Sequence, residues 1–272
     1  MRSRLLSTGT GLPALLLLLA SLVGCSTTPT SPVVTLPISA EVGNNWQIQS
    51  GTAITATSTG GAFLKGAMQI YGTQVTGTFQ TSSSCLNVPQ PLTYTGTYNA
   101  TTGALTLQPT PNAYVEVNLI VPADPTSLSA GTMGGAGNIC NTAFTGPAVG
   151  IEIPALTGTY TGTVTAASPS TSTGTATLTV SQTSPPANAL FSLTGTLQFT
   201  SGTCTASIPV TGAISGASFT LASAATATSA TITGADTQGG SSLPATAITF
   251  PNGPCNTGSS SAVTYTGNLT PQ

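Results

Sequence analysis

The stretches VTGTFQTSSSC (75–85) and LTGTLQFTSGTC (193–204) share one pattern: a threonine- and glycine-rich run with interspersed large apolar residues that ends in a cysteine. A second pair of segments follows, because CNTAFTG begins at Cys140 and CNTGSSSAVTYTG begins at Cys255. The two cysteine offsets are 119 and 115 residues. Landmarks that recur at a nearly constant offset indicate an internal duplication. We therefore predict two homologous units.

Each unit is expected to be built from strands and turns. Threonine makes up about a fifth of the chain, well above its usual share, and no segment has the 3.6-residue apolar period of a helix. Short β-branched runs recur instead at about 8 to 12 residues, the spacing of an all-β sandwich or barrel. In the first unit eight strands are expected near 46–57, 62–71, 74–82, 91–98, 104–108, 114–121, 127–133 and 142–149. We predict an all-β chain of two tandem homologous antiparallel meander domains, 41–155 and 156–272, each of about eight strands in a lipocalin-like barrel or a sandwich.

Local patterns refine this layout. The segment AYVEVNLIV (113–121) alternates, so the face that carries Val115, Val117, Leu119 and Val121 is expected to be core. Gly72-Thr73 and Ser215-Gly216 are typical of two-residue hairpin turns. The tripeptide Thr-Gly-Thr recurs at 76–78, 95–97, 157–159, 161–163 and 194–196. Glycine within a strand favours the bending of a barrel, but a glycine-rich composition explains the recurrence equally well.

The N-terminus has the features of an export signal. It begins with Arg2 and Arg4 and continues through a leucine run at 15–19, which is too short to span a bilayer. Leu22-Val23-Gly24-Cys25 resembles a bacterial lipobox, which implies cleavage after residue 24 and a lipid on Cys25; the alternative is an ordinary signal-peptide cleavage site. We expect a signal peptide at 1–24 and, at 25–40, the lipidated cysteine with a tether rich in Ser, Thr and Pro.

The remaining cysteines are expected to form disulfides. Lipidation uses one of five cysteines, and export into an oxidising compartment allows the other four to pair. The duplication favours one bridge inside each unit. We predict the pairs Cys85–Cys140 and Cys204–Cys255.

The charged residues exclude several classes of function. After cleavage Lys65 is the only basic side chain, against the acids Glu41, Glu116, Asp124, Glu152 and Asp236. A single lysine does not build a phosphate-binding surface, so nucleic acid is not expected as a partner. Without histidine there is neither a Ser-His nucleophile nor a histidine-rich zinc site. A Ser-x-x-Lys motif fails at Lys65, because Ala62 occupies the serine position.

Other candidate sites are better explained as structural features. Asp124 and Asp236 occupy equivalent places in the two units but lack the Asp-Thr-Gly context of an aspartic dyad, so turn aspartates are expected. Glu116 and Glu152 are not linked by any motif of a glycosidase and are expected on solvated faces. The run GTMGGAGN (131–138) does not lead into a helix, as a phosphate loop must.

Two resemblances bear on the fold and the cellular location. Gly43-Asn44-Asn45-Trp46 and Gly158-Thr159-Tyr160 are similar to the Gly-x-Trp that opens the first strand of lipocalins, although the first has one residue too many and the second has tyrosine. That family implies an eight-stranded barrel with an apolar calyx, with Trp46 and Tyr160 as weak ligand-binding candidates. The lipobox, the tether, the GNNWQIQSG opening and the Thr-Gly-Thr meanders together resemble the lipoproteins of unassigned function common in acidobacteria.

These observations predict a binding protein without catalytic residues, metal or cofactor. We expect a monomeric lipoprotein, anchored by lipid in the outer membrane, that faces the periplasm or the cell surface. Ser26 favours this location, because the aspartate that signals inner-membrane retention is absent. Its Thr- and Ser-rich exterior is suited to weak contacts with glycans or envelope proteins. The alternative function is a lipocalin-like carrier of a small hydrophobic ligand.

Overall fold

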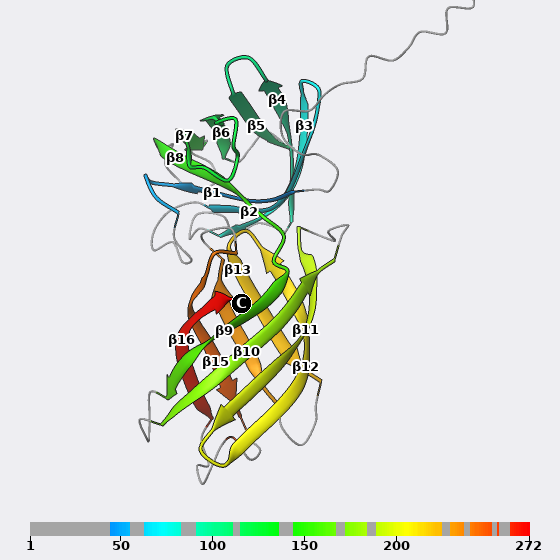
Figure 1. Cartoon of the computed structure of the whole chain (residues 1–272). Helices are drawn as coiled ribbons and strands as arrows, with labels where there is room; N and C mark the ends of the chain where they lie inside the picture. The colour runs from blue at the N-terminus through cyan, green and yellow to red at the C-terminus, as the bar shows by residue number, and fades with distance from the viewer. Residues whose placement is uncertain are drawn as a thin grey trace, which may run out of the picture. The chain divides into compact units, whose positions relative to one another are not determined.

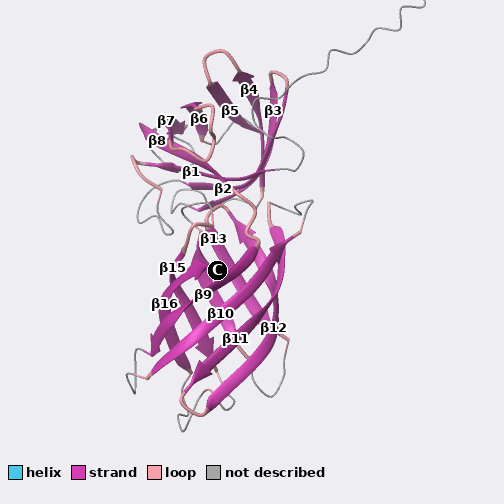
Figure 2. Cartoon of the chain, viewed as in Figure 1, coloured by secondary structure: helices cyan, strands magenta, loops and turns pink. Residues whose placement is uncertain are grey.

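The computed structural model of the chain describes residues 44–54, 63–82, 91–110, 115–135, 144–166, 172–183, 189–224, 229–236, 240–251, 255 and 262–272. Every regular element within these ranges is a β-strand (Figure 2). Among the same residues there is no helix with the length and apolarity needed to cross a membrane. The predicted all-β class is confirmed.

The first eight strands form a closed antiparallel barrel (Figure 1). They are β1 (Asn44–Ser50), β2 (Phe63–Tyr71), β3 (Gln74–Ser82), β4 (Leu92–Asn99), β5 (Ala104–Thr110), β6 (Glu116–Ile120), β7 (Ser129–Gly135) and β8 (Phe144–Ile153). Each strand pairs with the next in the chain, and β8 closes the barrel by pairing with β1. Most of the predicted strands are found close to their expected places. The first ends at Ser50 and not near residue 57, and the last extends to Ile153.

The second eight strands repeat this topology. They are β9 (Gly158–Ala166), β10 (Thr173–Gln182), β11 (Phe191–Ser201), β12 (Cys204–Ser215), β13 (Ser218–Ser223), β14 (Thr231–Ala235), β15 (Leu243–Phe250) and β16 (Val263–Pro271). Pairing of β16 with β9 closes this barrel. Both domains are therefore closed barrels and not sandwiches. Both lie within one compact unit, Leu36–Gln272.

The two predicted hairpin turns have different outcomes. Tyr71 pairs with Gln74, so Gly72-Thr73 is the two-residue turn that the sequence predicts. The other prediction is wrong by one residue, because Ser215 pairs with Ser218 and the turn is therefore Gly216-Ala217. Gly216 has a φ of 54°, which glycine adopts at no steric cost. The register thus places the residue with positive φ at the first position of the turn.

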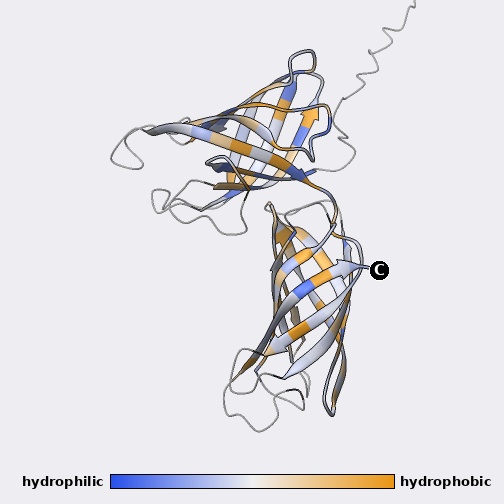
Figure 3. Cartoon of the chain, turned by 60° about the vertical axis from the view of Figure 1, so that its left-hand side comes forward, coloured by the Kyte–Doolittle hydropathy of each residue, from blue (hydrophilic) through white to orange (hydrophobic). Residues whose placement is uncertain are grey.

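The interior of the first barrel is filled by side chains that alternate along the strands. The predicted core face of the sixth strand and its flanks is buried, at Val115, Val117, Leu119 and Val121. Larger side chains join it, including Trp46, Phe79 and Tyr94, and the rings of Phe79 and Tyr94 meet edge to face with centroids 5.5 Å apart. Figure 3 shows the resulting alternation of hydropathy along the strands.

The core of the second barrel is centred on three aromatic rings. The Phe199 ring lies 4.8 Å, centroid to centroid, from both the Phe250 ring and the Tyr265 ring. The same hydrophobic cluster includes Ala67 from β2 and Ile151 and Ile153 from β8. The second core therefore continues into side chains that belong to strands of the first barrel.

One Thr-Gly-Thr glycine shows why this tripeptide suits a closed barrel. Gly96 lies in β4, in register with Leu107 of β5, the residue that follows Thr106. A Cβ atom at position 96 would collide with the backbone carbonyl oxygen of Thr106. Glycine therefore permits a close approach of adjacent backbones, as strand interiors of tightly coiled sheets require.

Candidate functional site

A row of buried polar side chains lies on the outer face of β1. Trp46 and Ile48 point into the first barrel core, so the alternating residues Asn45, Gln47 and Gln49 point outward. Their exposed fractions are nevertheless only 2, 0 and 3%. Such burial requires hydrogen-bonding partners, because an unpaired buried amide is costly.

Those partners come largely from the β12–β13 hairpin. The Asn45 side chain donates to the Gly216 carbonyl oxygen at 2.8 Å and accepts from the Gly216 N–H at 2.7 Å. The side-chain oxygen Oε1 of Gln47 accepts from the Ala217 N–H at 2.8 Å, and its side-chain Nε2 donates to Oε1 of Gln49 at 2.8 Å. The turn of the second barrel is thus held by side chains of the first.

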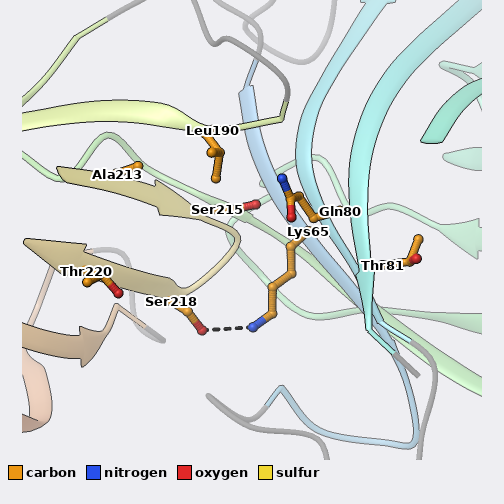
Figure 4. A pocket seen from close by; sticks show the side chains of 8 residues that line it. All are labelled: Lys65, Gln80, Thr81, Leu190, Ala213, Ser215, Ser218 and Thr220. Carbon is orange, nitrogen blue, oxygen red and sulfur yellow. Dashed lines mark hydrogen bonds between the residues drawn. The ribbon is translucent and has the colours of Figure 1, made fainter. Parts of the chain in front are cut away.

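Beside this row lies a cavity of about 320 Å³ (Figure 4). Its lining comes from both barrels: Lys65, Gln80, Thr81, Leu190, Ala213, Ser215, Ser218 and Thr220. Lys65 belongs to β2, Gln80 to β3, and Ser218 to β13. No sequence motif links these residues, because the contacts of Lys65 in the second barrel lie more than 150 residues away.

The Lys65 ammonium is the charged group of this cavity. It donates a hydrogen bond to the Ser218 hydroxyl oxygen at 2.8 Å, as Figure 4 shows, and lies 4.4 Å from the centroid of the Phe63 ring. Burial lowers the pKa of Lys65, because desolvation disfavours the charged form. Among the described residues, no carboxylate forms an ion pair with Lys65 and no nearby charge offsets its desolvation.

Ser215 adds a second feature to the cavity. It is 9% exposed, and its hydroxyl oxygen has no hydrogen-bond partner among the described residues. In Figure 4 this hydroxyl points toward the side of the cavity that carries Gln80 and Lys65. Sequence reasoning places Ser215 in a predicted hairpin turn but identifies neither Ser215 nor Ser218 as a site residue, since serine is common in this chain.

The two aromatic ligand candidates lie elsewhere. Trp46 is 1% exposed and belongs to the first barrel core, and Tyr160 is 3% exposed and belongs to the second. Neither side chain lines the cavity. Burial, with a smaller effect of the Asp236 charge, raises the pKa of Tyr160.

The predicted disulfide of the second barrel is present. Cys204, at the start of β12, is bonded to Cys255, and both residues are buried. Cys85, Cys140 and the lipidation candidate Cys25 lie outside the described residues. The second predicted bridge and the anchor therefore stay predictions.

The paired aspartates have different surroundings. Asp124 is exposed and accepts hydrogen bonds from the backbone N–H and the hydroxyl of Thr126 and from the Ser127 hydroxyl, which lower the pKa of Asp124. This is a turn aspartate, as the sequence suggests. Asp236 is fully buried and accepts from the Gly240 N–H at 2.7 Å.

The two glutamates also differ, and one expectation fails. Glu116 is exposed on β6, as expected, whereas Glu152 is largely buried and not on a solvated face. Glu152 of β8 is in register with Trp46 of β1, where these two strands pair and close the barrel. Its side chain therefore faces the barrel interior, as that of Trp46 does. One of its carboxyl oxygens has no hydrogen-bond partner in the described structure. Of the predicted glycine run, residues 131–135 belong to β7, and the remainder lies outside the described residues.

Replacing Glu152 with glutamine is expected to stabilise the protein above neutral pH. Burial, and to a smaller extent the charge of Asp124, raises the pKa of Glu152 to about 7. The pKa of Glu152 is thus higher in the folded than in the unfolded protein. The protonated carboxyl group therefore makes its full contribution to stability below about pH 4.5, and this contribution is lost as pH rises through about 7. After allowance for solvent screening, the loss is about 1 to 2 kcal/mol.

Urea unfolding at pH 5 and pH 8 measures this effect. Between pH 5 and pH 8 the free energy of unfolding should fall about 1 to 2 kcal/mol further in the wild type than in Glu152→Gln. Glu116→Gln, on an exposed position, is the control and should behave as wild type. An unchanged pH dependence in Glu152→Gln would show that the carboxyl group has an ordinary pKa.

Comparison with known proteins identifies no relative of this chain: no protein-family model, no curated protein and no solved structure matches it.

Proposed function

We propose that this protein is a non-catalytic lipoprotein that is held at the outer membrane by a lipid on Cys25 and binds neutral glycans of the cell envelope. The contact surface is the threonine-rich exterior of the second barrel. The carrier function is the alternative. The large aromatic side chains that fill both barrel interiors do not favour it, because a carrier needs an open apolar pocket.

The observation that carries this proposal is a lattice of threonines across β9 and β10. The cross-strand partners on the outer face are Thr159 with Thr179, Thr161 with Thr177, Thr163 with Thr175, and Thr165 with Thr173. Their hydroxyl oxygens lie 3.2 Å apart in the first pair and 3.0 Å apart in the second. Strand pairing thus arranges eight hydroxyl groups in two parallel rows.

The lattice continues onto the neighbouring strands. Thr196 and Thr200 of β11 are in register with Thr179 and Thr175 of β10, and Thr266 and Thr270 of β16 are in register with Thr165 and Thr161 of β9. None of these four strands contains a charged residue. The face is therefore broad, uncharged and rich in hydroxyl groups.

Such a face matches the chemistry of a neutral glycan. Each threonine hydroxyl both donates and accepts a hydrogen bond, as a sugar hydroxyl does. The β-branched side chain is stiff at χ1, so little conformational entropy is lost when a ligand binds. The absence of charge removes long-range attraction to ionic partners. Catalysis is not supported, since the mature chain has no histidine and one lysine to act near neutral pH.

The glycan proposal is tested with purified envelope polysaccharides and the full mature chain. We expect Thr161→Val with Thr177→Val, in one variant, to weaken polysaccharide binding at least threefold, because two central hydroxyl groups are lost. Thr97→Val with Thr106→Val is the matched control, since this pair of the first barrel has the same hydroxyl contact at 2.9 Å. Equal binding by all three proteins would overturn the proposal, and binding of a fatty acid alone would favour the carrier.

The anchor is tested separately. We expect mass spectrometry of the native protein to find an N-terminal peptide that starts at Cys25 and carries acyl mass. Cys25→Ala should release the protein from the membrane fraction. A mature chain that starts elsewhere and lacks acyl groups would contradict the lipoprotein assignment.

A further inference from the structure

We propose that the cavity around Lys65 binds a small hydroxylated carboxylate, of the size and chemistry of a single acidic sugar. This site is separate from the threonine lattice and does not depend on the proposed glycan binding there. Its support is the charge, the hydrogen-bonding groups and the size of the cavity.

The charge of the cavity selects an anion. Lys65 places an ammonium group in partly desolvated surroundings without a carboxylate partner among the described residues. A buried charge without a partner is unfavourable, and a bound anion relieves that cost. The ammonium has three N–H donors, and the bond to the Ser218 hydroxyl uses one of them. The described residues therefore leave two of these donors for a ligand carboxylate.

The hydrogen-bonding groups select a hydroxylated ligand. The Ser215 hydroxyl is nine-tenths buried, lines the cavity and has no partner among the described residues. Buried polar groups normally have a hydrogen-bond partner, so a ligand that reaches Ser215 would supply the missing bond. Thr220 and the Gln80 amide line the same space. A ligand with one carboxylate and several hydroxyl groups complements this set.

The size of the cavity limits the ligand to about one sugar ring. At about 320 Å³ it stands at the lower end of the range for small-molecule sites. Leu190 and Ala213 supply apolar contacts on its lining, which suit the C–H groups of a sugar ring.

Phosphate is a poorer match than carboxylate. Phosphate sites combine several positive groups with free backbone N–H groups, and this cavity has one lysine. The nearby N–H groups of Gly216 and Ala217 already donate to Asn45 and Gln47.

The same two bonds argue against Lys65 and Ser218 as a base and nucleophile, because these N–H groups are not available to stabilise an oxyanion.

Isothermal titration calorimetry tests the proposal. The full mature chain is titrated separately with D-glucuronate, D-glucose and inorganic phosphate. We expect D-glucuronate to bind at least tenfold more tightly than either of the others. Lys65→Met should weaken that binding at least tenfold, and Ser215→Ala about threefold or more. A short glucuronate oligomer distinguishes the source of the ligand: tighter binding than the monomer indicates a polymer end, and equal binding indicates a free acid.

The controls separate this site from general charge effects and from the threonine lattice. Asn118→Asp changes the net charge by the same amount as Lys65→Met, but at an exposed position of β6, and should bind as wild type. The Thr161→Val, Thr177→Val variant should also bind glucuronate normally, so failure of one proposal leaves the other standing. Equal binding by wild type, Lys65→Met and Ser215→Ala, or preference for glucose or phosphate, would overturn the carboxylate site.

Discussion

Replacing Cys204 and Cys255 together with alanine is expected to lower the free energy of unfolding by about 4 kcal/mol. The disulfide closes a loop with a sequence separation of 51 residues, and in the chain-entropy model a cross-link of that span stabilises by about 4 kcal/mol. Both cysteines are buried, at 3 and 1% exposure. Alanine is chosen because it leaves no unpaired hydroxyl group in the core.

Urea denaturation monitored by far-UV circular dichroism measures this loss. Trp46 is the single tryptophan and lies in the first barrel core, so its fluorescence reports on that barrel. The unfolding midpoint measured by this fluorescence should therefore shift less than the midpoint measured by circular dichroism. Cys85→Ala with Cys140→Ala is the matched variant, and an equal effect on the first barrel would support the predicted second bridge. A loss below about 1 kcal/mol for the Cys204, Cys255 variant would contradict the expected contribution of the cross-link.

Replacing Asn45 with alanine is expected to destabilise the protein by about 2 to 6 kcal/mol. The Asn45 amide satisfies both the N–H and the carbonyl oxygen of Gly216. Each buried backbone group that loses its partner costs about 1 to 3 kcal/mol. The lost contact joins a strand of one barrel to a hairpin of the other, so we also expect the unfolding transitions of the two barrels to separate.

Two further variants test the Asn45 contact. Asn45→Asp keeps an acceptor for the Gly216 N–H but places a carboxylate oxygen against the Gly216 carbonyl oxygen, so it should be at least as destabilising as alanine. Asn118→Ala, at an exposed position, should change stability by less than about 0.5 kcal/mol. If Asn45→Ala were as mild as Asn118→Ala, water would have to replace the amide without cost, and the contact would not stabilise the fold.

Local patterns were sufficient where one strand and its turns decide the outcome. The alternation that places Val117 and Leu119 on one face predicts their burial correctly, because successive side chains of a strand point to opposite sides. The turn at Gly72-Thr73 was also found, whereas the turn at Gly216-Ala217 was misplaced by one residue. A serine and a glycine both suit hairpin turns, so composition leaves the register open by one position.

The candidate site was not predictable in the same way. The sequence singles out Lys65 as the one lysine, but a Ser-x-x-Lys motif requires a serine three residues before it. The serine that contacts Lys65 is Ser218, in the other barrel. Glu152 was expected on a solvated face, yet it lies at an inward-facing position and is largely buried. In both cases the deciding neighbours are far away in the sequence.

The sequence alone determined the all-β class, the duplication, the number of strands in the first unit and the partner of Cys204, because each follows from spacing or periodicity along the chain. Tertiary structure decided barrel closure, the burial of Asn45 and Gln47, and the cavity at Lys65. Alternation assigns a side chain to a face of a strand but does not say what covers that face. For the outer face of β1 the cover is a hairpin about 170 residues further along the chain, and only the folded structure brings the two together.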